Sequence, residues 1–149
     1  MAEAVEFAGG TRAITEGEWA GWRNWGADPW EDAGGPFFYR VEEDGSVRCA
    51  FRSEAKHMNG AGFMHGGCMM TFADFFTFAL ADPSVDEATV TVSLNSEFVR
   101  GANAGDLIEA TGEVVRAGKS LIFVRGQITT GERILMTYSG VIRKFEKRG

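Results

Sequence analysis

The feature that most constrains the fold of this chain is an apolar stretch in its middle. Residues 66–81 have helix character and are apolar on nearly every face: Met69, Met70, Phe72, Ala73, Phe75, Phe76, Phe78, Ala79 and Leu80. A helix that is apolar all round must be buried all round. Asp82-Pro83 is expected to end it, because the residue before a proline disfavours helix. The rest of the chain is therefore expected to wrap around this helix.

The segments on either side of the helix predict strands. Asp44-Gly45 is flanked by the strand-like segments 37–43 and 46–51, and this is a strong hairpin signal. Four longer strand-like segments separated by turns follow the helix: 89–99, 107–115, 121–129 and 134–145. Parallel βαβ repeats are excluded, because only one helix separates the strands. We predict an α+β fold in which an antiparallel sheet wraps around one long buried helix.

The length of 149 residues fits a single domain, residues 1–149, with no repeat or low-complexity linker. Ahead of the predicted core of residues 37–145, Thr15 and Glu18 resemble a capping box. Trp19, Trp22 and Trp25 follow at steps of three. This pattern predicts a short Trp-rich amphipathic helix within residues 15–30. It would pack on the core as a lid, and its tryptophans could also line an apolar pocket.

Composition excludes several classes of function. The net charge of −6 argues against nucleic acid as a partner, because phosphate binding needs a basic face. No apolar run reaches the roughly 20 residues that span a bilayer, and the first residues do not resemble a signal peptide, so we expect a cytoplasmic protein. Cys49 and Cys68 have no metal-site spacing and are expected to be buried, reduced thiols. We expect no metal and no other cofactor.

Asp74 is the residue that packing explains least well. It is the only charged residue between His65 and Asp82, and it lies among phenylalanines and methionines. Burying an unpaired carboxylate costs several kcal/mol. Asp74 could cap another segment or pair with a buried cation. The functional interpretation is a carboxylate tuned to act as a base or a nucleophile.

His65-Gly66-Gly67 begins the same helix. Backbone N–H groups in a first helical turn lack partners within the helix, and glycine lets a ligand approach them closely. Gly66 is therefore a candidate oxyanion donor for acyl transfer. Eight residues separate Gly66 from Asp74, which is about 12 Å along a helix. One reacting carbon cannot contact both, so the donor and the carboxylate must come from two copies of the helix. The spacing predicts a homodimer with two equivalent composite sites.

The order Asn59, His65-Gly66-Gly67 and Asp74 resembles the hotdog-fold thioesterases of the phenylacetate-pathway and human thioesterase-superfamily-member-2 type. The resemblance covers about residues 37–145 and implies an acyl-CoA thioesterase working as a homodimer or a dimer of dimers. It places the Gly66 N–H and Asn59 near the thioester oxygen. It further implies that Asp74 activates water and that His65 orients the site and assists the leaving thiolate.

The family also uses a Ser or Thr on the strand after the helix, beside the aspartate of the partner chain. Alignment of the strand end assigns this position to Thr91, with Ser93 as a neighbouring candidate. Two features depart from the family pattern: the Trp-rich segment, and Gly101 where a proline is common. They leave the acyl group undetermined.

Coenzyme A carries phosphates, so cations should line the entrance to the site. The candidates are Arg100, Arg116, Lys119, Arg143 and Lys144. Two alternatives remain open from the sequence: a hotdog dehydratase or hydratase acting on acyl thioesters, and a non-catalytic acyl-CoA binding protein. The first usually carries a proline-containing loop that is absent here. A non-catalytic acyl-CoA binding protein would have little need of the Asp74 carboxylate.

Overall fold

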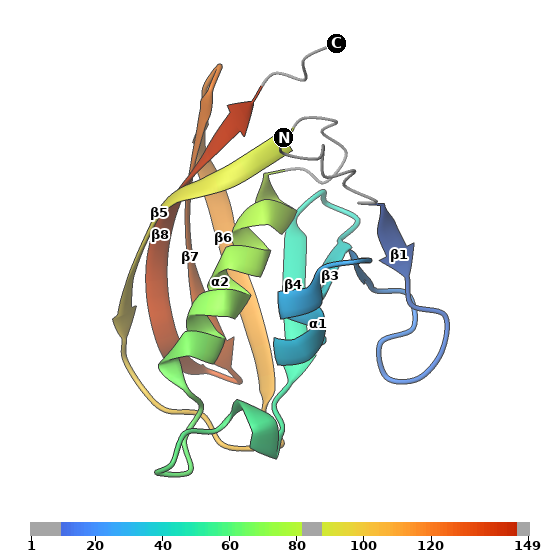
Figure 1. Ribbon diagram of the computed structural model, residues 1–149, viewed down its shortest axis with the longest axis vertical. Coiled ribbons are helices and arrows are strands. Elements are labelled where there is room, and N and C mark those ends of the chain that lie inside the picture. Colours follow the sequence, from blue (N-terminus) through green and yellow to red (C-terminus); the bar gives the residue numbers. More distant parts are fainter. Residues whose placement is uncertain (1–9, 82–87, 146–149) are drawn as a thin grey trace, which may run out of the picture.

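The computed structural model describes residues 10–81 and 88–145 (Figure 1). Along the chain the elements are β1 (Thr11–Ala13), β2 (Arg23–Trp25), α1 (Pro29–Gly34), β3 (Phe38–Val41), β4 (Val47–Arg52), the 3₁₀ turn η1 (Ala55–His57), α2 (Gly66–Leu80), β5 (Ala88–Phe98), β6 (Leu107–Ala117), β7 (Leu121–Thr130) and β8 (Arg133–Phe145). The predicted helix and all six predicted strands of the core are present, with ends that shift by a few residues. The proposed helix stop at Asp82-Pro83 lies outside the described residues.

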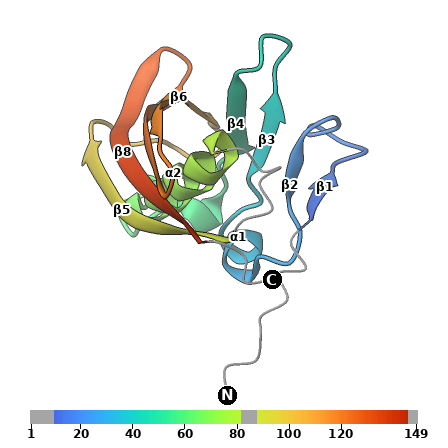
Figure 2. The same ribbon diagram turned by 90° about the horizontal axis from the view of Figure 1, so that it is seen from above.

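The described strands form one sheet in the order β1-β2-β3-β4-β6-β7-β8-β5, and every neighbouring pair is antiparallel. The long strands β5 to β8 curve around α2, and the short strands β3 and β4 continue the curve on its other side (Figure 2). The prediction of an antiparallel sheet wrapped around one long helix is confirmed.

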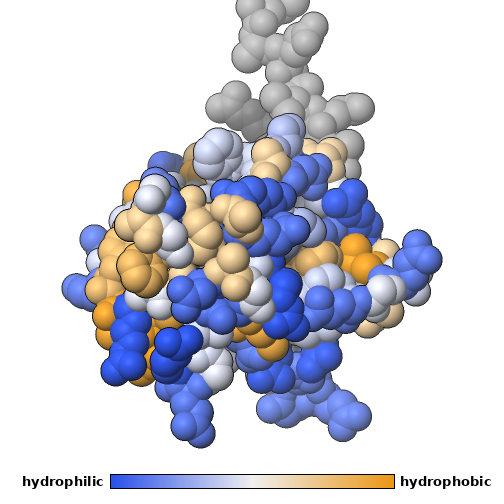
Figure 3. Space-filling view, turned by 90° about the horizontal axis from the view of Figure 1, so that it is seen from below, coloured by the Kyte–Doolittle hydropathy of each residue, from blue (hydrophilic) through white to orange (hydrophobic). Residues whose placement is uncertain are grey.

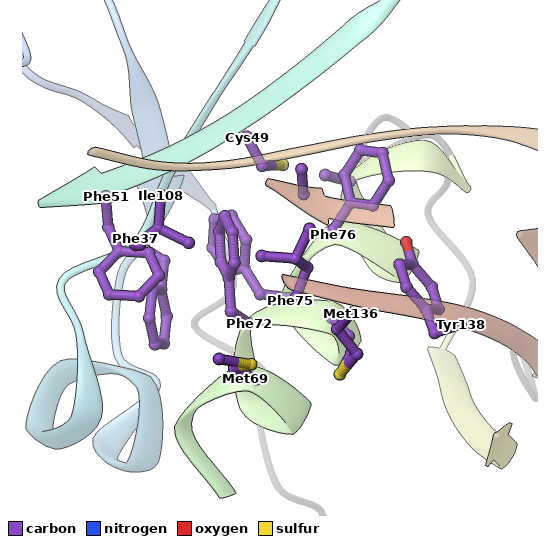
Figure 4. Packing of buried hydrophobic residues seen from close by; sticks show 14 of the residues in the cluster. Phe37, Cys49, Phe51, Met69, Phe72, Phe75, Phe76, Ile108, Met136 and Tyr138 are labelled. Atoms are coloured by element: carbon purple, nitrogen blue, oxygen red, sulfur yellow. The ribbon is translucent and has the colours of Figure 1, made fainter. Parts of the chain in front are cut away.

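Aromatic side chains fill the space between α2 and the sheet (Figure 4). The ring of Phe51 lies 4.9 Å from that of Phe37 and 4.7 Å from that of Phe72, both edge-to-face. Phe76 lies edge-to-face against Tyr138 of β8. Such pairs add stabilisation beyond the burial of apolar area. Because these rings come from α2 and from both halves of the sheet, they fix the position of the helix.

One face of α2 is not buried, which corrects the expectation of burial all round. Met69, Phe72, Phe75 and Phe76 are buried, but a stripe of the helix is partly open: Gly67, Met70, Thr71, Asp74 and Phe78. These positions recur at helical spacing, so they share one face. The sheet of a single chain does not close around this face. The apolar residues in the stripe account for the misleading all-round pattern.

The Trp-rich segment is not a helix, which also corrects the prediction. Gly17 and Gly21 have φ angles of 80° and 89°, which a right-handed helix does not allow. Trp22 packs with Phe38 in a small separate cluster, whereas Trp25 lies in β2 and stacks at 5.1 Å on Tyr39 in the main core. The spacing of three thus places two tryptophans on opposite faces of the sheet.

The only helix that the structure describes before the core is α1, and the start signal for it was missed. Asp28 accepts a hydrogen bond from the Glu31 backbone N–H at 3.0 Å, and Pro29 occupies the first helical position. This arrangement is a regular helix N-terminus. At the other end of α1, the buried His57 donates from Nε2 to the Gly34 carbonyl at 2.6 Å. His57 is therefore a structural residue that connects η1 to α1.

Candidate active site

His65 caps the N-terminus of α2. Its Nδ1 accepts a hydrogen bond from the Gly67 N–H at 2.8 Å, which uses one of the free donors of the first turn. Within the described residues the Gly66 N–H has no partner. A Cβ atom at position 66 would lie 3.3 Å from the Phe98 ring. The Gly66 N–H is thus a free donor at the positive end of a helix dipole, at a position where a side chain would be crowded.

Asn59 lies in the exposed loop that leads to this helix. Its Oδ1 accepts hydrogen bonds from the backbone N–H groups of Ala61 and Phe63, at 2.9 and 3.2 Å. The amide oxygen therefore organises the loop, as an Asx turn does. The loop is closed by a bridge between Met58 and Met64, so Asn59 lies on the same side of the molecule as the N-terminus of α2.

Asp74 lies on the open face of α2, eight residues after Gly66. Thr91 Oγ1 of β5 donates a hydrogen bond to Asp74 Oδ1 at 2.6 Å. Hydrogen bonds to a carboxylate are shorter and stronger than neutral ones. This contact differs from the expectation that the strand hydroxyl lies beside the partner's aspartate. Within the single chain, the hydroxyl binds the aspartate of its own α2.

A β-bulge explains why Thr91 points to the helix. Ser96 and Leu94 of β5 face the core side, since Ser96 contacts Met70 and Leu94 packs on the core. Strict alternation would place Val92 on that side too. The pairing with β8 shifts between Thr91 and Ser93, which leaves Val92 as the extra residue. The bulge exposes Val92 and turns Thr91 toward Asp74. Thr89, Thr91 and Ser93 therefore do not share one regular face.

A pocket of about 350 Å³ opens beside Asp74, between α1 and α2. Its lining residues are Asp28, Trp30, Glu31, Met70, Thr71 and Asp74. Trp30 Nε1 donates to Thr71 Oγ1 at 3.2 Å, across the two helices. Sequence reasoning missed Asp28, Trp30 and Glu31, although Asp28-Pro29 was a readable helix start that would have placed them on one helix.

Two carboxyl groups of this pocket, those of Asp74 and Glu31, have raised pKa values. Burial raises the pKa of Asp74, the Thr91 hydroxyl lowers it, and the charge of Asp28 raises it further. Burial, followed by the neighbouring Asp28, raises the pKa of Glu31 to about 8. Titratable groups with strongly shifted pKa values in a pocket are candidates for function. Among the described residues, no His, Cys, Asp or Glu cluster has the arrangement of a metal site.

The structure does not bring Gly66 and Asp74 of one chain together. Helix α2 is continuous from Gly66 to Leu80, so the estimate of about 12 Å between the two positions holds. His65, Gly66 and Asn59 gather at the start of α2, whereas Asp74 and Thr91 form a second group in its middle. A single chain thus contains two separate halves of the predicted site.

The candidate cations fall into two places. Lys119 lies in the turn between β6 and β7, the Lys144 backbone N–H donates to Ser120 in that turn, and Arg143 pairs with Leu121. Arg116 lies at the end of β6, close to this turn. Arg100 follows the C-terminal end of β5, away from the turn. None of the five forms a salt bridge within residues 10–81 and 88–145.

Cys68 is not a candidate nucleophile. It packs against the core in the first turn of α2, and burial raises the pKa of its thiol to about 11. The thiol therefore stays protonated near neutral pH, and Cys49 is fully buried. In the part of the chain that is described, no helix is long and apolar enough to cross a membrane.

The sequence and the fold match a known class of enzyme. Residues 61–137 match the family model described as the thioesterase superfamily, which covers half of the chain. The chain therefore belongs to the thioesterase superfamily, and it is a thioester hydrolase with the hotdog fold.

Among the curated relatives, a candidate esterase of Pseudomonas aeruginosa is 33% identical over 117 residues, which cover 77% of this chain and 87% of that protein. Human acyl-coenzyme A thioesterase 13 is 33% identical over 86 residues, covering 57% of this chain and 61% of the relative.

Two solved structures have a similar fold. The Escherichia coli PaaI protein from the phenylacetic acid degradation operon superposes with a TM-score of 0.70 at 22% identity, over 80% of this chain and 86% of its own. A Bacillus halodurans protein solved with CoA has a TM-score of 0.67 at 22% identity, over 74% of each chain. At this level of identity the similarity establishes the fold.

Proposed function

We propose that this chain hydrolyses an acyl-CoA to the free acid and CoA, with Asp74 as the catalytic carboxylate. The observation that carries the proposal is the pairing of Asp74 with Thr91 at the edge of an open pocket. The Asp74 carboxylate is half-buried and accepts a hydrogen bond from Thr91 that can orient it. It also faces space that a substrate can enter. Named acyl-CoA thioesterases and CoA-bound structures among the relatives support CoA as the thiol half of the substrate.

Asp74 acts either as a general base or as a nucleophile. As a base, it takes a proton from water while the water oxygen attacks the thioester carbon. As a nucleophile, its own oxygen attacks the thioester carbon, the C–S bond breaks, and CoA leaves as the thiolate. Water then hydrolyses the resulting anhydride and regenerates Asp74. In both cases negative charge develops on the thioester oxygen. The free N–H of Gly66 is suited to stabilise that charge, since a preorganised donor costs no reorganisation during reaction.

The donor and the carboxylate come from two subunits in this proposal. Because about 12 Å separates Gly66 from Asp74 in one chain, Gly66 of the partner subunit would supply the oxyanion donor at Asp74. His65 and Asn59 lie with Gly66, so they would serve the same site from that subunit. His65 would orient the N-terminus that it caps and assist the departing thiolate, and Asn59 would lie near the thioester oxygen.

Strand β5 supplies a surface for this homodimer. It ends the sheet order, and among the described strands it pairs only with β8. Large apolar side chains near this edge are exposed: Val90, Val92, Phe98 and Val99. Figure 3 shows hydrophobic residues gathered on the side where Figure 1 draws β5. A long apolar edge strand favours pairing with another chain. A second copy would also cover the open face of α2, and two dimers could associate further as a tetramer.

The cations at the β6–β7 turn are suited to the CoA phosphates. Arg116, Lys119, Arg143 and Lys144 gather there without a described acidic partner, whereas Arg100 lies apart. A polyanionic ligand is bound by local positive charges of this kind, and the net charge of the whole protein can still be negative. The free thiols Cys49 and Cys68 fit a reducing compartment, so we place the enzyme in the cytoplasm.

The test is thiol release from a panel of acyl-CoAs with aromatic, medium-chain and hydroxylated acyl groups. We expect at least one to be hydrolysed with kcat/KM in the range of about 10⁴ M⁻¹s⁻¹ or above. Asp74→Asn keeps the size of the side chain and should lower kcat on that substrate by roughly 100-fold or more. Its melting temperature should remain close to that of the wild type. Full turnover by Asp74→Asn on the best thioester would exclude Asp74 as the catalytic carboxylate.

A further inference from the structure

Helix α1 is anchored at both of its ends, to α2 near its start and to η1 at its end. Near its start, Trp30 Nε1 donates to Thr71 Oγ1 at 3.2 Å. At its end, the Gly34 carbonyl accepts from His57 Nε2 at 2.6 Å. Glu31 lies between these two anchors and lines the pocket beside Asp74. A side chain on a helix anchored in this way has a defined place in the wall of the site.

Glu31 and Asp74 have opposite hydrogen-bond environments. Asp74 accepts the Thr91 hydroxyl at 2.6 Å, which stabilises its ionised form. Glu31 is half-buried and forms no salt bridge with any described residue. Asp28 also has a donor, since its Oδ1 accepts the Glu31 backbone N–H at 3.0 Å, whereas among the described residues no hydrogen bond to the Glu31 carboxylate is found. The geometry therefore favours a negative charge on Asp74 and a neutral Glu31.

The titratable groups that act on Glu31 reinforce this difference. They are all acids: Asp28, Asp32 and Asp74. The thiol of Cys49 on β4 is a further neighbour, and the charge of Glu31 raises its pKa. The nearby cations are engaged elsewhere, since Arg12 pairs with Asp32 at 3.3 Å and Lys56 approaches Glu54 at 3.8 Å. Burial and these charges together raise the pKa of Glu31 to about 8. Two carboxyls that share a pocket resist carrying two charges at once.

We propose that Glu31 is a positioning residue for Asp74, the neutral member of a carboxyl pair that leaves its single negative charge on the carboxylate bound by Thr91. The inference rests on the proposed function, in which Asp74 must be ionised to react. When Glu31 loses its proton, a further negative charge enters the pocket, beside those of Asp74 and Asp28. That charge opposes the negative charge that develops on the thioester oxygen. Activity should thus fall as the pH rises through the ionisation of Glu31.

The first experiment measures kcat/KM on the best thioester from about pH 6 to about pH 10, with spontaneous hydrolysis subtracted. The wild type should lose roughly 10-fold on the alkaline side, since a charge inside a half-buried pocket is only partly screened. Glu31→Gln keeps a neutral side chain of the same size and should abolish this alkaline decrease. Asp32→Asn is the matched control, because Asp32 is on the same helix but outside the pocket. It should retain the decrease, moved to slightly lower pH, because the charge of Asp32 also raises the pKa of Glu31. An alkaline limb that persists in Glu31→Gln would overturn the proposal.

A second measurement needs no substrate. Isotope-labelled glutamate allows the carboxyl of Glu31 to be titrated by NMR in the folded protein. Its midpoint should be near 8 in the wild type and lower in Asp74→Asn, which removes one of the neighbouring charges. A midpoint near the ordinary value of about 4.3 would overturn the proposal even if the enzyme is active. If no thioester is hydrolysed, the proposed function fails, and this titration still decides whether the carboxyl pair exists.

Discussion

At the scale of single residues, the contact between Thr91 and Asp74 connects the fold to the proposed chemistry. Asp74 is held on α2, and Thr91 reaches it only because the bulge at Val92 turns the strand. The hydroxyl can both orient the carboxylate and lower its pKa, against the burial that raises it. Removing the hydroxyl should therefore affect the rate and the pH dependence together.

Thr91→Val is nearly isosteric and removes only the hydroxyl. We expect kcat to fall roughly 10-fold to 150-fold, with little change in KM, because a hydrogen bond to a charged group is worth about 1.5–3 kcal/mol. The pKa of Asp74 should rise, so the acid limb of kcat/KM should move to higher pH. Thr89→Val, the control on the same strand, should leave both unchanged. Full kcat in Thr91→Val together with loss in Ser93→Ala would assign the role to Ser93 instead.

At the scale of elements, α2 has two functions that depend on different faces. Its buried face carries phenylalanines that interlock with β3, β4 and β8, and its open face carries Asp74. The aromatic contacts hold the helix in place, and this in turn places Asp74 opposite Thr91. Helix α1 is anchored to the same open face through Trp30. Substitutions on the buried face of α2 should therefore lower stability, and substitutions on its open face should lower activity.

Phe72→Ala tests the buried face. Phe72 has no exposed surface, and its removal should leave a cavity between the rings of Phe37 and Phe51. We expect a loss of about 3–5 kcal/mol in the free energy of unfolding, measured by urea denaturation at fixed protein concentration. Val41→Ala is the control, because Val41 is 60% exposed at the end of β3. A loss below about 1 kcal/mol in Phe72→Ala would contradict the packing described for α2.

At the scale of the whole molecule, the two halves of the proposed site require two chains. Asp74→Asn and a bulky substitution at Gly66 each break one half, so each variant alone should be inactive. Gly66→Leu is suitable, since even a Cβ atom at this position would crowd the Phe98 ring. After mixing, each heterodimer would contain one intact site and one doubly broken site.

Verified subunit exchange should then restore roughly a quarter of the wild-type activity, because half of the dimers are mixed and each has one working site. Unmixed samples of either variant serve as controls at the same chain concentration. If exchange is demonstrated by mass spectrometry and activity stays at the level of the single variants, the composite site is wrong.

Much of the fold was predictable from local patterns. The apolar run of α2, the Asp44-Gly45 turn and the alternation of β6 to β8 are each encoded within short segments, so an antiparallel sheet around one helix follows from them. Asp74 and Gly66 stood out for the same reason, since a lone carboxylate in an apolar helix and glycines at its start are visible in the sequence. The three-residue spacing of the tryptophans wrongly predicted a helix. The same spacing also arises when residues of extended segments pack on the two faces of a sheet.

The tertiary structure decided what depends on residues far apart in the chain. The bulge that directs Thr91 to Asp74 arises from the pairing of β5 with β8, and no local pattern marks Val92 as the extra residue. Glu31 becomes part of the pocket because α1 docks on α2, where the contacting residues Trp30 and Thr71 are 41 positions apart in the chain. The sequence by itself determined the elements and the reactive residue types, since both depend on local chemistry. Only the folded chain determined which of them meet, because those contacts depend on packing between distant segments.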